Sequence, residues 1–282
     1  MKKLVSIPTE NLINWYDDVV SLKIDIPAKT ILEDIRLQIN DRYNHYIERF
    51  SSEQMISITN SLFARNHPAL LSCYKSEGKT LTNLKTKIRD LQENGLKGTC
   101  QYCGVSKPNS MDHYLPISDY PEFSILGINL IPCCTDCNGK KRSYWKDGAR
   151  GIINFYLDEI PDEQFLFATV HFIGNVPSLN YELRNDNNLH EDFFEILSKH
   201  FNRLELIPLY KTQSSDELDE IIRALTIYVD NPNPAVLRNN LLKDASQLQV
   251  RFGINYWRAV MRIGLAESDD FLIYIIDDLI IQ

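Results

Sequence analysis

Two closely spaced cysteine pairs constrain this 282-residue chain more than any other feature of its sequence. Two residues separate Cys100 from Cys103 and Cys134 from Cys137, and 30 residues lie between the two pairs. Two intervening residues allow one tight turn to direct both sulfur atoms at one ion, and paired motifs of this kind are typical of tetrahedral zinc sites. We therefore expect a structural Zn²⁺ bound by four thiolates, with no open position for chemistry.

Spacing alone leaves two other assignments open. Cys133 could replace Cys134 in a C-x3-C arrangement, although the C-x2-C spacing favours Cys134. A redox-active dithiol is the other alternative. Disulfide bonds are not expected, because Pro8 stops the apolar N-terminal stretch short of the roughly 7–15 residues of a secretory signal, which favours a cytoplasmic protein. Cys73 is expected to be a small buried residue.

A second pattern runs between and beyond the cysteine pairs. Its elements are Asp112-His113-x-x-Pro116, Asn129-Leu130-x-Pro132 and, directly after Cys137, Asn138 and Lys141. In this order and spacing, the segment of residues 98–145 resembles the HNH endonucleases (the His-Me finger or ββα-metal family) that carry a pair of zinc knuckles. Asn138 stands at the third letter of the family name, where many members have the same substitution.

The resemblance implies metal-dependent hydrolysis of phosphodiester bonds in nucleic acid, with DNA favoured over RNA. His113 is the expected general base, because the imidazole pKa near 6.5 suits proton abstraction at neutral pH. By the same resemblance, Asp112 and Asn138 hold a catalytic Mg²⁺ or Mn²⁺ through oxygen atoms, which hard cations prefer. Asn129 would brace the loop and orient His113 through hydrogen bonding. On a regular strand Asp112 would face away from His113, so this reading needs a twisted backbone.

The three basic residues Lys140, Lys141 and Arg142 are expected to contact phosphate groups from the helix that follows the second cysteine pair. Charge is distributed in agreement with a central nucleic-acid site: residues 84–150 carry a net charge of +3, whereas residues 151–282 carry −11. The acidic region would bind a basic partner or form a solvated surface.

Nuclease activity has a rival interpretation, a catalytically inactive zinc-knuckle protein that binds nucleic acid or acts as an adaptor. The intact set of Asp112, His113 and Asn138 favours the enzyme. By analogy with other HNH proteins of this size, the chain is expected to be an effector in a prokaryotic antiphage or mobile-element system, with a regulatory partner such as an ATPase.

The predicted fold class is α+β and mostly α, with a small ββα zinc core between helical flanks. Residues 1–95 are expected to form a helical region, residues 96–150 the HNH core, and residues 151–282 an acidic, α-rich region. Within the last region, residues 165–173 and 179–183 predict a β-hairpin. A short helix is expected at residues 152–157, and the acidic run 216–220 after two serines predicts a helix start.

Overall fold

The computed structural model describes residues 1–63, 67–75, 78–228 and 233–280. The chain divides into two compact units, one of residues 3–160 and one of residues 161–282 together with Met1 and Lys2. The sequence predicted a boundary near residue 95, but the N-terminal helices and the central segment form a single unit. Their contacts explain this, because helices α3 (Arg36–Ser51), α4 (His67–Lys75) and α5 (Lys79–Asp90) pack directly on short turns of the central segment.

The N-terminal part of the first unit is helical, as predicted. Its α-helices bury apolar side chains at helical spacing, as α5 does with Leu81, Leu84 and Ile88. The elements are α1 (Ile13–Ser21), α2 (Ile26–Asp34), α3 (Arg36–Ser51), η1 (Met55–Ser57), α4 (His67–Lys75), α5 (Lys79–Asp90) and α6 (Asn94–Lys97).

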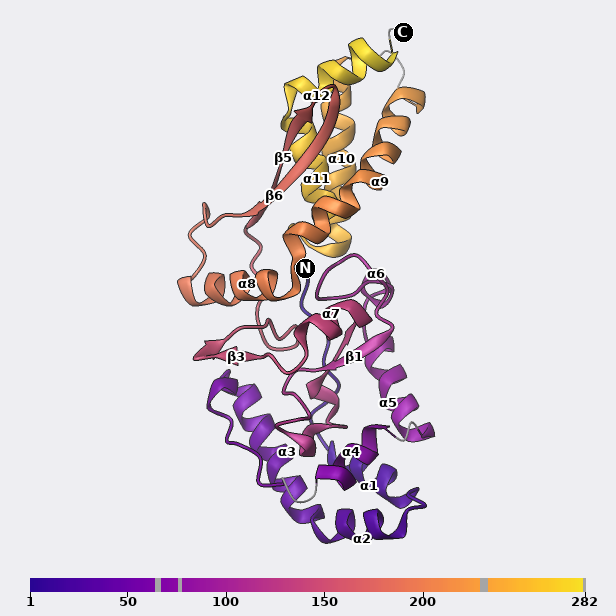
Figure 1. Cartoon of the computed structure of the whole chain (residues 1–282), viewed down its shortest axis with the longest axis vertical. Helices are drawn as coiled ribbons and strands as arrows, with labels where there is room; N and C mark the ends of the chain where they lie inside the picture. The colour runs from indigo at the N-terminus through magenta and orange to yellow at the C-terminus, as the bar shows by residue number, and fades with distance from the viewer. Residues whose placement is uncertain (64–66, 76–77, 229–232, 281–282) are drawn as a thin grey trace. The chain divides into compact units, whose positions relative to one another are not determined.

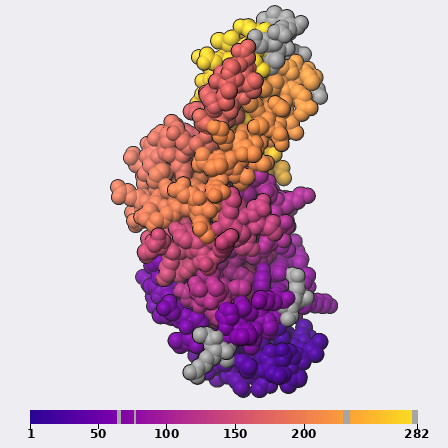
Figure 2. Space-filling model, viewed as in Figure 1, coloured from indigo at the N-terminus to yellow at the C-terminus, as the bar shows by residue number. Residues whose placement is uncertain are grey.

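The central segment contains an antiparallel strand pair followed directly by a helix. Strand β1 (Ser110–His113) pairs with β2 (Leu130–Cys133), so that His113 lies opposite Leu130. Two short turns, η3 (Pro121–Phe123) and η4 (Gly127–Asn129), connect them, and α7 (Thr135–Lys141) packs on β1 (Figure 1). In the space-filling view, atoms of the N-terminal helices lie directly against those of the central segment (Figure 2).

The predicted helix at residues 152–157 is wrong. This stretch is irregular and buried. It follows the two-residue strands β3 (Lys146–Asp147) and β4 (Ala149–Arg150). The carboxylate of Asp158 accepts hydrogen bonds from the backbone of Asn154 (2.8 Å) and from the Arg150 guanidinium (3.0 Å). Asp158 thereby satisfies the backbone N–H of the buried Asn154 without a helix.

The second unit places helices beside the predicted hairpin, which is confirmed as β5 (Leu166–Ile173) and β6 (Val176–Leu183). Gly174 begins its two-residue turn with φ +63°, a conformation that favours glycine. Helix α11 approaches β5 so closely at Gly264 that an added Cβ would lie 2.4 Å from the Ala168 carbonyl oxygen. The helices are α8 (Glu191–Leu204), α9 (Leu206–Tyr228), α10 (Pro234–Phe252), α11 (Trp257–Glu267), α12 (Asp269–Tyr274) and η5 (Ile275–Ile280).

Helices dominate both units, and the described residues form three small two-stranded sheets. The mostly α form of the predicted α+β class is therefore confirmed. Within the described ranges, no helix has both the length and the apolar composition that crossing a bilayer requires.

Candidate active site and metal centre

The four predicted cysteine ligands form one buried cluster. The Sγ atoms of Cys100, Cys103, Cys134 and Cys137 all lie within 4.8 Å of one another, and those of Cys103 and Cys134 are 4.0 Å apart. A tetrahedral ion with Zn–S bonds of about 2.3 Å separates its sulfur ligands by about 3.8 Å. The cluster therefore fits a metal ion such as Zn²⁺.

Backbone amide groups surround the sulfur atoms and support negative charge on them. The N–H of Cys134 donates to Cys100 Sγ (3.2 Å), and the N–H of Cys137 donates to Cys134 Sγ (3.4 Å). Hydrogen bonds from the thiol of Cys100 and from the other two cluster thiols lower the pKa of Cys134. The same thiol contacts raise the pKa of Cys137, so Cys134 is the ligand on which these hydrogen bonds favour the metal-binding thiolate form.

The two remaining cysteines lie outside the cluster. Cys133 is buried on β2, where burial raises the pKa of its thiol, and it is not among the clustered sulfur atoms. The structure thus selects Cys134 over Cys133. Cys73 is 1% exposed, and burial raises its thiol pKa to about 11, which agrees with its predicted role as a small buried residue.

A polar cavity of about 370 Å³ opens beside α7 and β1. It brings together several predicted site residues: Asp112, His113, Asn138 and Arg142. The other lining residues are Tyr74, Ser110, Met111, Pro116, Ile117, Ser118 and Ser143. Most of these residues carry polar side chains, so the cavity suits a charged or polar group.

His113 is held in a defined orientation at the end of β1. Its Nε2 donates a hydrogen bond to the Ser124 carbonyl (2.8 Å). Because a carbonyl can only accept, the proton is on Nε2 and the lone pair is on Nδ1. Burial lowers the pKa of His113 to about 4, so the ring is neutral at pH 7 with Nδ1 unprotonated.

One carboxylate oxygen of Asp112 is bound by side chains inside the protein, although Asp112 also lines the cavity. Its Oδ2 accepts a hydrogen bond from the Tyr102 hydroxyl (2.6 Å) and forms an ion pair with Lys141 Nζ (3.0 Å). The same Nζ donates to the His113 carbonyl oxygen (2.8 Å). Lys141 is fully buried, which corrects the expectation that it contacts phosphate: its charge serves Asp112 inside the protein.

Asn138 lies on α7 and faces β1. Its side-chain amide nitrogen donates to Ser110 Oγ (2.8 Å) and to the Met111 carbonyl (3.3 Å). These bonds fix the amide plane and leave Oδ1 without a hydrogen-bond donor among the described residues. The side chain therefore presents an oxygen atom beside the cavity that it lines.

Asn129 is fully buried and bonds two segments that follow His113 in the chain. Its Oδ1 accepts from the Leu115 backbone N–H (2.8 Å), and its Nδ2 donates to the carbonyl oxygens of Leu115 (3.1 Å) and Phe123 (3.3 Å). Leu115 follows His113 by two residues, and Phe123 precedes Ser124. Asn129 thus ties together the two segments that hold the His113 ring, without a hydrogen bond to His113 itself.

The other two predicted phosphate-binding residues lie nearer the surface. Lys140 is half-buried on α7, whereas Arg142 is exposed, ends the helix with φ +51° and lines the cavity. The Nε of Arg142 donates to the Gly139 carbonyl (3.2 Å), which directs the side chain along the helix end. Arg142 is therefore the member of the basic run that borders the cavity.

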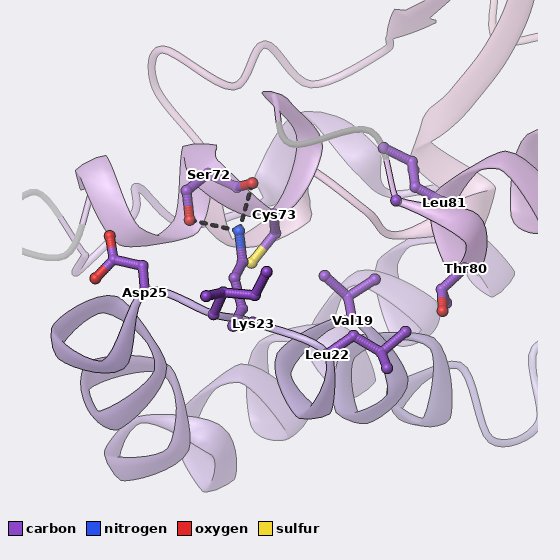
Figure 3. A pocket seen from close by; sticks show the side chains of 10 residues that line it. Val19, Leu22, Lys23, Asp25, Ser72, Cys73, Thr80 and Leu81 are labelled. Carbon is purple, nitrogen blue, oxygen red and sulfur yellow. Dashed lines mark hydrogen bonds between the residues drawn. The ribbon is translucent and has the colours of Figure 1, made fainter.

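A larger cavity of about 520 Å³ lies among α1, α2, α4 and α5 (Figure 3). Apolar side chains such as Val19, Leu22 and Leu81 form much of its wall. The amine of Lys23 already donates to the carbonyl (2.6 Å) and hydroxyl (2.8 Å) oxygens of Ser72. Its lining includes none of the predicted site residues, so we assign it no chemical role.

Sequence reasoning missed three residues that contact the site. Tyr102 bonds Asp112, Ser124 bonds His113, and the Tyr74 ring packs against the His113 ring. Tyr102 lies inside the first cysteine pair, where its position next to a ligand could have drawn notice. Nothing in the sequence pattern connects Tyr74 or Ser124 to His113.

Comparison with known proteins gives one informative similarity. No protein-family model matches the chain, and no solved structure matches it. The chain is 27% identical over 303 aligned residues to "Protein ea31" of Escherichia phage lambda. The match covers 88% of this chain and 98% of the phage protein. The chain is therefore similar to that phage protein over nearly its whole length.

Proposed function

We propose that the chain is a metal-dependent HNH endonuclease that hydrolyses phosphodiester bonds in nucleic acid, with DNA as the expected substrate. One observation carries the proposal: His113 and Asn138 line the same polar cavity, on a strand pair and helix next to the four-cysteine cluster. In this proposal, the strands β1 and β2 and the helix α7 are the ββα core of the enzyme.

In the proposed reaction, His113 acts as general base. Its neutral ring has the lone pair on Nδ1, because Nε2 is bonded to Ser124. Nδ1 would take a proton from the attacking water as its oxygen bonds to phosphorus. The P–O bond to the leaving oxygen breaks in the same displacement, and that oxygen takes a proton from solvent water. Asn129 would keep His113 in register by tying Leu115, two residues after it, to Phe123, which precedes Ser124.

The residues of the cavity are compatible with a catalytic Mg²⁺ or Mn²⁺. The Oδ1 atoms of Asp112 and Asn138 accept no hydrogen bond from any described residue, and both residues line the cavity. Mg²⁺ commonly takes only one or two protein oxygens and keeps several waters. When bound, such an ion stabilises the charge on the phosphate and the leaving oxygen.

The remaining parts of the site would position the substrate. Arg142 offers a guanidinium at the cavity edge for bidentate contact with phosphate, and Lys140 adds positive charge on the same helix. A Zn²⁺ held by the cysteine cluster would fix the start of α7. It would have no open coordination position, so it would act on structure alone.

A second candidate function is a zinc-knuckle protein that binds nucleic acid or acts as an adaptor without catalysis. The observation that favours it is the buried pairing of Asp112 with Lys141 and Tyr102. A carboxylate held in this way has one oxygen committed inside the protein. The intact His113 and Asn138 favour the enzyme over this alternative.

The biological setting belongs to the same proposal. Similarity to a protein of phage lambda agrees with a mobile-element setting, and the effector role in a mobile-element or antiphage system is proposed by analogy with other HNH proteins of this size. We propose that the enzyme acts in the cytoplasm and that a regulatory protein partner, such as an ATPase, controls it.

The proposal is tested by cleavage of supercoiled plasmid DNA by the purified full-length protein. With Mg²⁺, we expect nicked or linear product from the wild type and none after addition of EDTA. His113→Ala should abolish cleavage while zinc stays bound and the protein stays folded, because the imidazole is removed without touching the cysteine cluster. Cleavage by His113→Ala equal to that of the wild type would remove His113 from its role.

A further inference from the structure

One face of helix α4 contacts His113 directly and also through Ser124. The Tyr74 ring meets the His113 ring edge-on, with centroids 4.4 Å apart and planes at 72°. One turn earlier on α4, the Leu70 carbonyl accepts a hydrogen bond from Ser124 Oγ (3.2 Å). Ser124 is the residue whose carbonyl holds His113 Nε2. Because residues four apart share a helix face, α4 contacts the imidazole directly and also supports its hydrogen-bond partner.

Tyr74 is itself held between other groups. The Lys85 ammonium on α5 lies 4.6 Å from the centroid of the Tyr74 ring. The Tyr74 hydroxyl donates to the Met111 carbonyl on β1 at 3.5 Å, which is a long hydrogen bond. The side chain is half-buried and forms part of the wall of the polar cavity. A ring packed on these sides has little freedom to move away from His113.

We infer that Tyr74 is a positioning residue for His113, supplied by a helix outside the segment that resembles the HNH family. The inference rests on the proposed nuclease function. A single hydrogen bond at Nε2 lets an imidazole tilt about that bond, and an aromatic edge against the ring restricts the tilt. Tyr74 thereby keeps Nδ1 directed into the cavity. The aromatic ring carries this role, so phenylalanine should replace tyrosine.

Steady-state cleavage of a short DNA duplex in Mg²⁺ tests this role. We expect Tyr74→Leu to lower kcat roughly 10- to 100-fold, because a displaced catalytic group slows the chemical step. KM should stay unchanged, since Tyr74 holds the base rather than the substrate. The Tyr74→Phe variant should keep the wild-type kcat. Tyr274→Leu removes a comparable edge contact, with Phe172 in the second unit, and should leave both constants unchanged.

A second readout does not depend on catalysis. Nitrogen-15 NMR of the zinc-loaded full-length protein should show the Nε2–H form of His113 in the wild type and in Tyr74→Phe. Tyr74→Leu, or Tyr74→Met where the leucine variant fails to fold, should show a mixture of both neutral tautomers. A wild-type kcat together with an unchanged His113 tautomer in the folded variant would overturn the inference.

The failure of the nuclease proposal would look different. In that case the wild type would not cleave DNA, or His113→Ala would cleave it, whatever residue occupies position 74. The NMR comparison would then decide alone whether Tyr74 fixes the His113 ring.

Discussion

The Asp112 carboxylate and the Lys141 ammonium form an ion pair at the base of the candidate site, and both side chains are almost fully buried. Burying two charges is costly unless further hydrogen bonds satisfy them. Tyr102 donates to the carboxylate, and Lys141 donates to the His113 carbonyl. Lys141 therefore holds both Asp112 and His113 from inside the protein. A solvent-facing lysine could not make these two contacts.

Removing the Lys141 charge tests this role. Lys141→Met keeps the volume but leaves the Asp112 carboxylate buried and unpaired, so the free energy of unfolding should fall by about 3–5 kcal/mol. Urea unfolding measures this change. Lys107 is exposed, and Lys107→Met should shift the free energy of unfolding by less than about 0.5 kcal/mol. Equal effects of the two variants would contradict an internal role for Lys141.

Helix α7 combines several functions of the site within seven residues. Cys134 caps its N-terminus and Cys137 lies in its first turns, so the helix starts at the cysteine cluster. Asn138 faces β1 from the same helix, and Lys141 reaches Asp112 from its last turn. The cluster therefore sets the position of every site residue that α7 carries.

Serine substitution of single cysteines distinguishes the zinc ligands from the neighbouring Cys133. Cys137→Ser should lower the zinc content and the melting temperature, because oxygen is a poorer zinc ligand than a thiolate in a four-sulfur site. Cys133→Ser should keep the bound zinc, since Cys133 lies outside the cluster. Metal analysis by mass spectrometry measures both variants. Zinc loss from Cys133→Ser but not from Cys137→Ser would reverse the assignment.

Features encoded over short distances in the sequence were predictable. The cysteine spacing located the cluster, and the alternation around Gly174 located the hairpin. The start of α9 was not predicted, because Ser214 looks like a cap in sequence. In the structure Ser214 Oγ bonds the Tyr210 carbonyl one turn earlier (2.7 Å) and the Tyr181 hydroxyl (2.7 Å), so the helix runs through it.

Contacts between distant residues set the limit of prediction at the site. Tyr74 and Lys141 both had ordinary sequence surroundings, as an aromatic residue in a helix and a basic residue in a charged run. Their roles arise from packing, which places Tyr74 against a histidine 39 positions later and Lys141 against an aspartate 29 positions earlier. No local pattern records such pairs.

The whole chain consists of two units with separate cores. The predicted nuclease residues all lie between residues 3 and 160, and the acidic hairpin-and-helix unit contains none of them. Stability in the two units should therefore respond to different substitutions.

A substitution at Gly264 tests this independence in the full-length protein. Gly264→Ala forces a methyl group against the Ala168 carbonyl, and overpacking of this kind costs about 1–3 kcal/mol. Calorimetry should show a lower melting temperature for the unit of residues 161–282 only. Zinc content and DNA cleavage should stay unchanged. Gly98→Ala, where an added Cβ meets no atom within 4 Å, should leave the melting temperature of that unit unchanged. Loss of zinc from Gly264→Ala would show that the two units depend on each other.

The two halves of the cysteine cluster lie on either side of the segment that holds Asp112, His113 and Asn129. An ion joining them closes a ring of about 30 residues, a constraint that a chain-entropy estimate values at roughly 3–4 kcal/mol for a comparable covalent bridge. Reducing conditions break a disulfide but leave such a coordination link intact. The ion would thus act as a reversible cross-link, restricting the unfolded chain in an environment where oxidised sulfur bonds do not persist.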